Sequence, residues 1–185
     1  MELKEPLMII KIGGNVLDHH EDTIDFLQKL IKYPNRKILV HGGGKIATDL
    51  SARLGIETRM VDGRRITDFE TLKVATMVYA GWTNKSLVAH LQSMEVNALG
   101  LSGADLNLIQ ANKRENRDID YGWVGDVARV YVKRWAFLLE NGVLPVLCAI
   151  THDNKGHLLN TNADTIASEL AVALSTKYPV QLIYC

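Results

Sequence analysis

This chain has few cysteines, no net charge and no linker segment, and each of these absences argues against a class of protein. Its 185 residues contain 2 cysteines, and 21 basic residues balance 21 acidic ones. Cys148, in an apolar run, and Cys185, at the last position, offer neither a disulfide framework nor metal-ligand spacing, so we expect a reducing, cytoplasmic setting. A neutral chain without a basic block argues against nucleic-acid or membrane-surface partners.

Long hydrophobic runs are absent as well. Residues 1–6 are polar and the first apolar run is far too short to span a bilayer, so no signal peptide is expected. No internal repeat and no Pro- or Ser-rich linker divides the chain. With 47% hydrophobic residues, the chain fits one domain with a sizeable core, or one domain with part of a second.

Two short apolar segments run directly into glycines. Residues 7–10 precede Lys11-Ile12-Gly13-Gly14, and residues 37–40 precede His41-Gly42-Gly43-Gly44. This pattern predicts two buried strands, each followed by a loop; we call residues 13–14 the first glycine loop and residues 42–44 the second. Backbone N–H groups that no Cβ shields can approach an anion, so a phosphate or carboxylate ligand fits there, although tight turns alone also use such glycines. Neither loop matches the Walker or the Gly-x-Gly-x-x-Gly pattern.

Helical periodicity follows both loops. Apolar residues at 24, 27, 30 and 31 predict one helix, and those at 46, 50 and 54 predict a second whose positive end faces the second glycine loop. Strands alternating with helices predict a parallel sheet. Thr67 and Glu70 form a capping-box pattern at the start of a third helix, which Gly81 is expected to break or kink before a further helix through residues 87–94.

The second half of the chain changes character. Alternation over residues 127–132 predicts an antiparallel hairpin beside the parallel sheet. A short helix over 135–141 is followed by a very apolar strand over 143–150, in which Pro145 is expected to limit the pairing. Residues 160–164 open another helix and 180–184 form a strand. The sequence then stops inside an apolar run, from which we expect that a C-terminal part is missing.

An ordered set of short motifs covers nearly the whole chain and resembles the acetylglutamate kinases of the amino acid kinase family. The individual motifs are weak, but their order is specific. They are Lys11-Ile12-Gly13-Gly14, His41-Gly42-Gly43-Gly44, Gly63-x-Arg65-Ile66-Thr67, Asn84-Lys85, Gly100-Leu101-Ser102-Gly103, Glu140-Asn141-Gly142-x-x-Pro145-Val146 and Asn160-x-Asn162-Ala163-Asp164.

The resemblance implies an α/β fold, a three-layer αβα sandwich around a mostly parallel sheet. It implies that residues 1–185 form a single amino acid kinase domain, mainly the N-terminal lobe for substrate binding and dimerisation, with the ATP lobe beginning near residues 177–185. The implied reaction is phosphorylation, by ATP with Mg²⁺, of the side-chain carboxylate of N-acetyl-L-glutamate or a related N-acyl-glutamate, the second step of arginine biosynthesis.

The resemblance also suggests residues for the phosphoryl end of the site. Lys11 neutralises charge on the transferring phosphoryl group, and Gly13, Gly14 and Gly43 donate backbone N–H groups to it. Asp164 orients Lys11 rather than acting as a base, because a carboxylate nucleophile is already ionised near neutral pH. For Asp164, a favourable interaction with the helix dipole is the competing explanation.

Other residues are expected to bind the amino-acid substrate. Gly43 and Gly44 line its site, Arg65 holds its α-carboxylate in a two-pronged grip, and Asn160 lies near its amide or α-carboxylate. Alternatively, Arg65 is a surface arginine, and Asn160 and Asn162 only cap the following helix. The sequence does not determine which acyl group the substrate carries. We expect the residues that contact this group to lie within 101–108 or 121–127.

Some family features have no counterpart in this sequence. The family's second catalytic lysine and its adenine pocket belong to the C-terminal lobe, so residues 1–185 alone are expected to be inactive and to bind acyl-glutamate better than ATP. Only six residues precede the first strand, which leaves no room for the helix that forms arginine-inhibited hexamers. We therefore expect a homodimer, with the helices of residues 68–94 as its surface.

Two rival functions stay open. The chain could be another member of the same kinase family, acting on carbamate, aspartate, glutamate or uridylate; the Arg65 motif and residues 160–164 argue against this. It could also be a non-catalytic binding module that has lost its ATP lobe. A reading frame that continues past Cys185 with a lysine-bearing segment favours the kinase, whereas an early stop codon favours the module.

Overall fold

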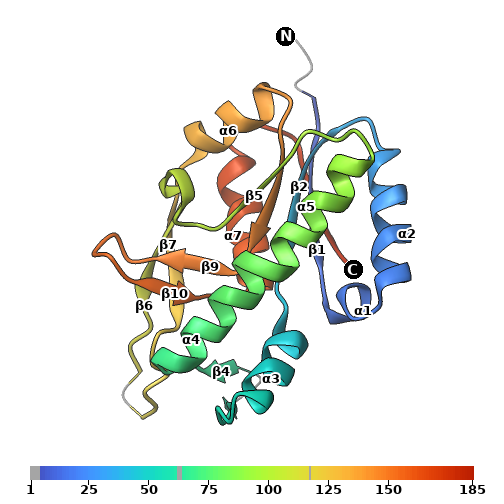
Figure 1. Cartoon of the computed structure of the whole chain (residues 1–185). Helices are drawn as coiled ribbons and strands as arrows, with labels where there is room; N and C mark the ends of the chain where they lie inside the picture. The colour runs from blue at the N-terminus through green and yellow to red at the C-terminus, as the bar shows by residue number, and fades with distance from the viewer. Residues whose placement is uncertain (1–4, 62–63, 117) are drawn as a thin grey trace.

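The computed structural model describes residues 5–61, 64–116 and 118–185, and describes only the backbone of Arg64. Residues 1–4 and Gly63, which belongs to one of the motifs, lie outside the described residues. Figure 1 shows a mixed fold of helices packed around strands. In the described part of the chain, no helix is long and apolar enough to cross a membrane.

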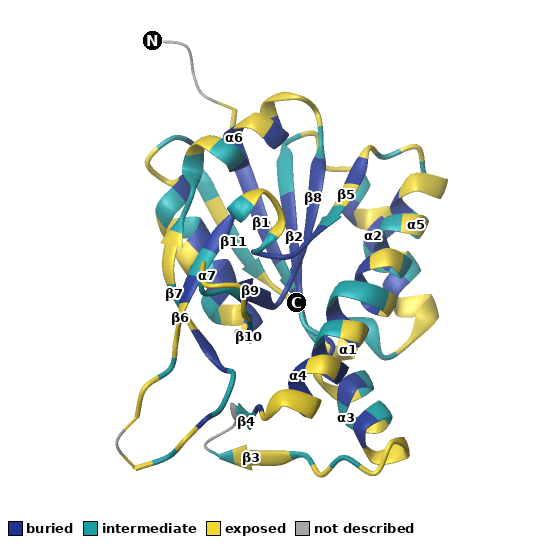
Figure 2. Cartoon of the chain, turned by 60° about the vertical axis from the view of Figure 1, so that its left-hand side comes forward, coloured by how far each residue is buried: buried dark blue, intermediate teal, exposed yellow. Residues whose placement is uncertain are grey.

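Five parallel strands form the central sheet in the order β11-β1-β2-β8-β5. They are β1 (Leu7–Ile12), β2 (Arg36–His41), β5 (Ala98–Leu101), β8 (Leu144–Cys148) and β11 (Val180–Tyr184). Helices α2 (His20–Ile31) and α5 (Asn84–Ser93) cover one face, and α6 (Val132–Glu140) and α7 (Ala163–Leu174) cover the other (Figure 2). The expected three-layer αβα arrangement with a mostly parallel sheet is confirmed.

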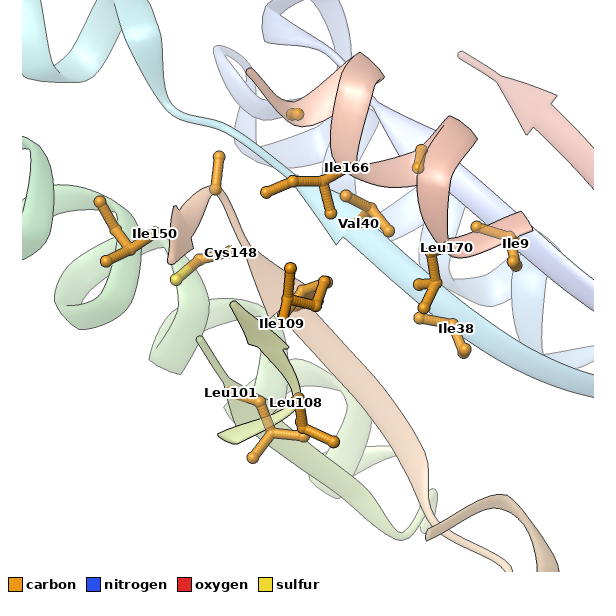
Figure 3. Close-up of a cluster of buried hydrophobic side chains, with 14 of the residues drawn as sticks. Ile9, Ile38, Val40, Leu101, Leu108, Ile109, Cys148, Ile150, Ile166 and Leu170 are labelled. Carbon is orange, nitrogen blue, oxygen red and sulfur yellow. The ribbon is translucent and has the colours of Figure 1, made fainter. Parts of the chain in front are cut away.

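The side chains of β1 alternate between these two faces. Leu7 and Ile9 belong to the core cluster on the α7 side, and Met8 and Ile10 belong to the cluster on the α2 side. Figure 3 shows the strand residues Ile9, Ile38 and Val40 close to Ile166 and Leu170 of α7. A strand buried on both faces is apolar at consecutive positions, which is why residues 7–10 form an unbroken apolar run.

The start of α4 (Phe69–Thr76) differs from the prediction. The capping-box assignment to Thr67 is wrong, since Asp68 is the N-cap residue and its carboxylate accepts a hydrogen bond from the Thr71 N–H at 2.8 Å. Aspartate is as good a cap as threonine, so the helix begins one residue later than the pattern suggested. The Thr67 hydroxyl does not cap the helix and is therefore available for hydrogen bonds with other residues.

Of the break or kink expected at Gly81, the break is absent, and Gly81 lies within an irregular helical segment. A π-helical segment, η1 (Met77–Thr83), joins α4 to α5, and the three run as one long diagonal helix in Figure 1. A π-helical turn contains an extra residue and is frequent at functional sites. Tyr79 and Thr83 of this segment, and Asn84 directly after it, all have buried side chains.

The predicted hairpin of β6 (Ile109–Lys113) and β7 (Gly125–Val130) is confirmed as antiparallel. It belongs to a separate four-stranded sheet, with β9 (Ile150–His152) and β10 (Leu158–Asn160). The pairing of β8 is limited at Pro145 on one edge only: it begins at Val146 towards β2, whereas towards β5 it runs through Leu144 and Pro145. Proline lacks the N–H that a sheet pairing needs.

The remaining elements gather beyond the carboxyl ends of the central strands (Figure 2). They are α1 (Gly14–Leu17), α3 (Gly44–Arg53) and the hairpin of β3 (Arg59–Val61) and β4 (Arg64–Ile66), while η2 (Asp105–Asn107) follows β5. In open parallel sheets, ligands bind at this edge, where the strands end and the loops begin.

Candidate active site

A pocket of ≈ 260 Å³ lies at the carboxyl ends of β1 and β2. Both glycine loops, β4 and the start of α7 contribute to its wall. All eight residues that the sequence suggested for the site line this pocket, namely Lys11, Gly13, Gly14, Gly43, Gly44, Arg65, Asn160 and Asp164. The fold therefore brings together residues from four separate parts of the chain, although their position alone does not assign a role to any of them.

Lys11 and Asp164 form an ion pair at this pocket. The Lys11 Nζ lies 2.8 Å from Asp164 Oδ1, and the Lys11 side chain is only 18% exposed. Lys11 is near the end of β1, and Asp164 is in the first turn of α7. The carboxylate restricts the direction of the ammonium group, so the pair presents an oriented cation to whatever occupies the pocket.

The first glycine loop has fewer free backbone N–H groups than its sequence suggested. The Gly13 N–H donates to the carbonyl of Cys185 at 2.9 Å, which extends the pairing of β1 with β11. This N–H is therefore already paired, contrary to the predicted donation to a phosphate. Gly14 is the first residue of α1, where backbone N–H groups have no partner within the helix.

The second glycine loop leads directly into α3. Gly43 is the N-cap residue, and because it has no side chain, no cap hydrogen bond reaches the first turn. The N–H groups of the first turn of a helix have no intrahelical partner, and the helix dipole favours an anion there. The start of α3 is thus suited to a phosphate or carboxylate, as the sequence predicted.

Arg65 faces the start of α3 from β4. Its Nη2 donates to the Gly44 carbonyl at 3.0 Å and to Thr48 Oγ1 at 2.8 Å, and its Nη1 donates to Thr58 Oγ1 at 3.3 Å. Both hydrogens of Nη2 are used in this way. A two-pronged grip on a carboxylate needs Nη2 together with Nε or Nη1, so a ligand held like that must displace one of these contacts.

Thr67 connects the two residues expected to bind the amino-acid substrate. Asn160 Nδ2 donates to Thr67 Oγ1 at 3.0 Å, and Thr67 Oγ1 donates to the Arg65 carbonyl at 3.2 Å. The capping alternative applies only to Asn162, whose Oδ1 accepts from the Thr165 N–H at 2.9 Å. Asn160 is instead the last residue of β10.

Several pocket residues were not predicted from the sequence. Tyr79, Arg114 and Ala149 come from η1, the hairpin region and the end of β8, and nothing in their local sequence marks them. Arg114 is paired with Asp126. Of the two segments expected to contact the acyl group, 121–127 contributes Val124, whereas residues 101–108 contribute none to the lining of this pocket.

His41 lies beneath the pocket as a buried, uncharged histidine. Its side chain is 0% exposed, and burial lowers its pKa to about 4, with the positive charge of Lys85 acting in the same direction. The ring contacts the carbonyl of Gly42 and the amide of Asn84. Charging this ring therefore costs free energy in the folded state but not in the unfolded chain.

The pH dependence of stability follows from this difference. An unfolded histidine takes up its proton near pH 6.5, whereas folded His41 does so only near pH 4, so stability is complete above pH 6.5 and falls as the pH decreases towards 4. We expect His41 to account for a loss of about 3 kcal/mol over that range. Urea unfolding at pH values from 4 to 8 measures this loss of stability. The His41→Gln variant should lack this part of the slope; an equal slope in both proteins contradicts the assignment.

Comparisons with known proteins agree on the family. Residues 6–179 match the model described as "Amino acid kinase family". An acetylglutamate kinase of Cytophaga hutchinsonii is 55% identical over 182 residues, which are 98% of this chain and 69% of that protein. Another, of Parabacteroides distasonis, is 52% identical and is covered to 71% of its length.

A solved structure shares the fold at lower identity. The N-acetylglutamate synthase of Neisseria gonorrhoeae, solved with coenzyme A and N-acetyl-glutamate, superposes with a TM-score of 0.80 at 22% identity. The match covers 96% of this chain and 41% of that one. At this identity, the likeness supports the fold alone.

Proposed function

The chain belongs to the amino acid kinase family, and from this premise we propose that it transfers the γ-phosphoryl group of ATP to the side-chain carboxylate of N-acetyl-L-glutamate or a related N-acyl-glutamate. The observation that carries the proposal is the convergence of Lys11, the start of α3 and Arg65 on one pocket. A substrate with two carboxylates and a phosphoryl donor needs cationic groups and backbone N–H groups together.

Lys11 would act at the phosphoryl end of the pocket. In the reaction, a carboxylate oxygen attacks the γ-phosphorus, the bond between that phosphorus and the oxygen of ADP breaks, and ADP leaves. No proton has to be removed, because the carboxylate is already ionised. Catalysis is then mostly positioning and charge stabilisation, and the ion pair with Asp164 at 2.8 Å holds the Lys11 ammonium group for that purpose.

Arg65 and Asn160 would bind the other end of the substrate. Arg65 can accept the α-carboxylate if the ligand replaces its contact with Gly44 or Thr48. Asn160 is linked to Arg65 through Thr67, so their positions are coupled. Apolar residues of the pocket lining are available for the acyl group; they are Ile12, Leu17, Met60, Val124, Ala149 and Ala163.

Magnesium belongs to the proposal as an ion brought by the nucleotide. Among the described residues, no group of three or more His, Cys, Asp or Glu side chains could hold a metal ion, and the pocket carboxylate Asp164 already pairs with Lys11. Mg²⁺ is commonly held by substrate phosphates and water with few protein ligands. These residues do not form a magnesium site of their own, and no step above depends on one.

The homodimer and the cytoplasmic setting also remain proposals. Three large apolar side chains on α4 and η1 face solvent: Phe69, Met77 and Trp82, the last being 71% exposed. Contiguous exposed apolar patches mark interaction surfaces, and we propose that these three side chains belong to one. Sedimentation of the complete gene product decides whether two copies associate. Both cysteines are free thiols, which agrees with a reducing compartment.

An assay of ADP release tests the function. The complete gene product should form ADP from ATP with one member of a series of N-acyl-glutamates, and trapping with hydroxylamine should give the hydroxamate expected of an acyl phosphate. Free glutamate, which lacks the acyl group, should give little ADP. Activity with free glutamate, aspartate, carbamate or uridylate instead would favour another kinase of the family. Binding of an N-acyl-glutamate without ADP formation would favour a binding module.

A further inference from the structure

A network of buried polar side chains contacts the second glycine loop. His41 is the last residue of β2, Asn84 is the first residue of α5, and their side chains are 0% and 1% exposed. Asn84 Nδ2 lies 3.0 Å from His41 Nε2 and 2.9 Å from the Val146 carbonyl oxygen. His41 Nδ1 lies 2.8 Å from the carbonyl oxygen of Gly42, which lines the pocket.

The partners of this network determine where its protons lie. The Val146 carbonyl can only accept, so the Asn84 atom facing it is the amide nitrogen, and the second hydrogen of that nitrogen points to His41 Nε2. Nε2 must therefore accept. A neutral imidazole then carries its proton on Nδ1, which donates it to the Gly42 carbonyl.

The orientation of the Asn84 amide is restricted on its other side. Its Oδ1 accepts a hydrogen bond from Lys85 Nζ at 3.1 Å. Strand β5 passes so close that a Cβ added at Gly100 would lie 2.0 Å from this oxygen. Because the amide is enclosed and all its polar atoms are paired, rotating it would leave buried groups without partners.

The same helical segment also contacts the loop directly. A Cβ added at Gly43 would lie 2.9 Å from the ring of Tyr79 and 3.3 Å from Thr83 Oγ1. The second glycine loop is therefore held by η1 through these two side chains and by α5 through Asn84 and His41. Within this support, the hydrogen bond from His41 sets the direction of the Gly42 carbonyl.

We propose that Asn84 is a positioning residue for the pocket: it fixes the proton of His41 on Nδ1, and His41 in turn fixes the second glycine loop and the N–H groups at the start of α3. The effect on the loop follows from the network itself, whereas the effect on catalysis rests on the proposed kinase function. Small displacements of groups that align a reacting phosphoryl reduce rates strongly.

The isosteric variant Asn84→Asp tests this proposal. An aspartate offers no N–H to His41, so it can only accept from Nε2, and the proton pattern of the ring has to change. In ¹⁵N spectra of the complete gene product, His41 should be protonated on Nδ1 alone in the wild type and should carry a proton on Nε2 in the variant. The backbone amide signals of Gly42, Gly43 and Gly44 should shift with it. With an N-acyl-glutamate as acceptor, kcat/KM should fall by about tenfold to a hundredfold.

Gln92→Ala is the matched control. Gln92 is on the same helix, and its side-chain amide donates to the Ala98 carbonyl of β5 at 2.9 Å. Its loss should leave the His41 ring, the loop signals and kcat/KM unchanged. If Asn84→Asp does not fold, Asn84→Ser serves instead: its hydroxyl is too short to reach Nε2, so the ¹⁵N signal of Nε2 should shift and the loop signals should move with it, while the Gly42 carbonyl still accepts the proton of Nδ1.

Three results would overturn the proposal. They are a His41 ring still protonated on Nδ1 alone in the folded Asn84→Asp variant, a changed ring signal without movement of the loop signals, and a changed loop without loss of kcat/KM. Failure of the proposed function is distinguishable, because an inactive wild type leaves the ¹⁵N spectra and the loop signals fully informative.

Discussion

Replacing Lys11 with alanine should reduce kcat by at least about 10²- to 10³-fold, with little change in the KM for the N-acyl-glutamate. Lys11 is held at 2.8 Å from Asp164, so its ammonium group is already oriented before reaction. Its charge is needed most where negative charge accumulates between the attacking carboxylate and the departing ADP. A group that stabilises the transition state more than the bound substrate changes kcat rather than KM. Steady-state kinetics on the complete gene product measures both constants.

Lys29→Ala is the appropriate control for this variant. Lys29 Nζ also pairs with an aspartate, Asp25, at 2.6 Å, but both residues are on the outer surface of α2. Its removal should leave kcat and KM unchanged, because neither residue lines the pocket, and should change stability little, because the pair is exposed. A large rise in KM for Lys11→Ala with kcat preserved would mean that Lys11 only binds substrate.

Gly43→Ala should reduce kcat/KM by about a hundredfold or more, because the loop cannot keep its conformation. Gly43 has φ of 153°, in a region that residues with a side chain rarely adopt, and the added methyl group would lie 2.9 Å from the Tyr79 ring. The ring is buried and cannot easily retreat. We also expect the free energy of unfolding to fall by about 1–3 kcal/mol. Kinetics and urea unfolding together measure the two effects.

The Gly55→Ala variant separates the energetic cost of an unfavourable backbone conformation from the cost of the steric clash with the Tyr79 ring. Gly55 follows the other end of α3 and has φ of 73°, but nothing lies within 4 Å of an added Cβ. This variant should lose some stability and keep its kcat/KM. If Gly43→Ala is no less active than Gly55→Ala, the second glycine loop does not need the geometry described above.

The two substrate-binding candidates depend on each other. Asn160 and Arg65 are 95 positions apart but share Thr67 as a hydrogen-bonding partner. Thr67 is fully buried, so its hydroxyl has few alternative partners. Changes at Thr67 and Asn160 are therefore not expected to be additive, whereas Arg65 contributes its backbone carbonyl, which a substitution of its side chain keeps.

Much of this fold could be predicted from local sequence patterns. Two apolar segments followed by glycines identified β1, β2 and the loops that end them, because consecutive apolar residues are required of a strand covered on both faces. Helical spacing identified α2 and α3, and alternation identified the hairpin of β6 and β7. The ordered motifs singled out eight of the residues that line the pocket.

Only the tertiary structure decided which of these groups are available and what supports them. The Gly13 N–H is paired with Cys185, and both Nη2 hydrogens of Arg65 are used, which no local pattern could reveal. The contact of Asn84 with His41 joins residues 43 positions apart and brings the first turn of α5 against the end of β2. Local patterns record which face of an element is apolar, whereas a hydrogen bond between distant residues depends on how the elements pack.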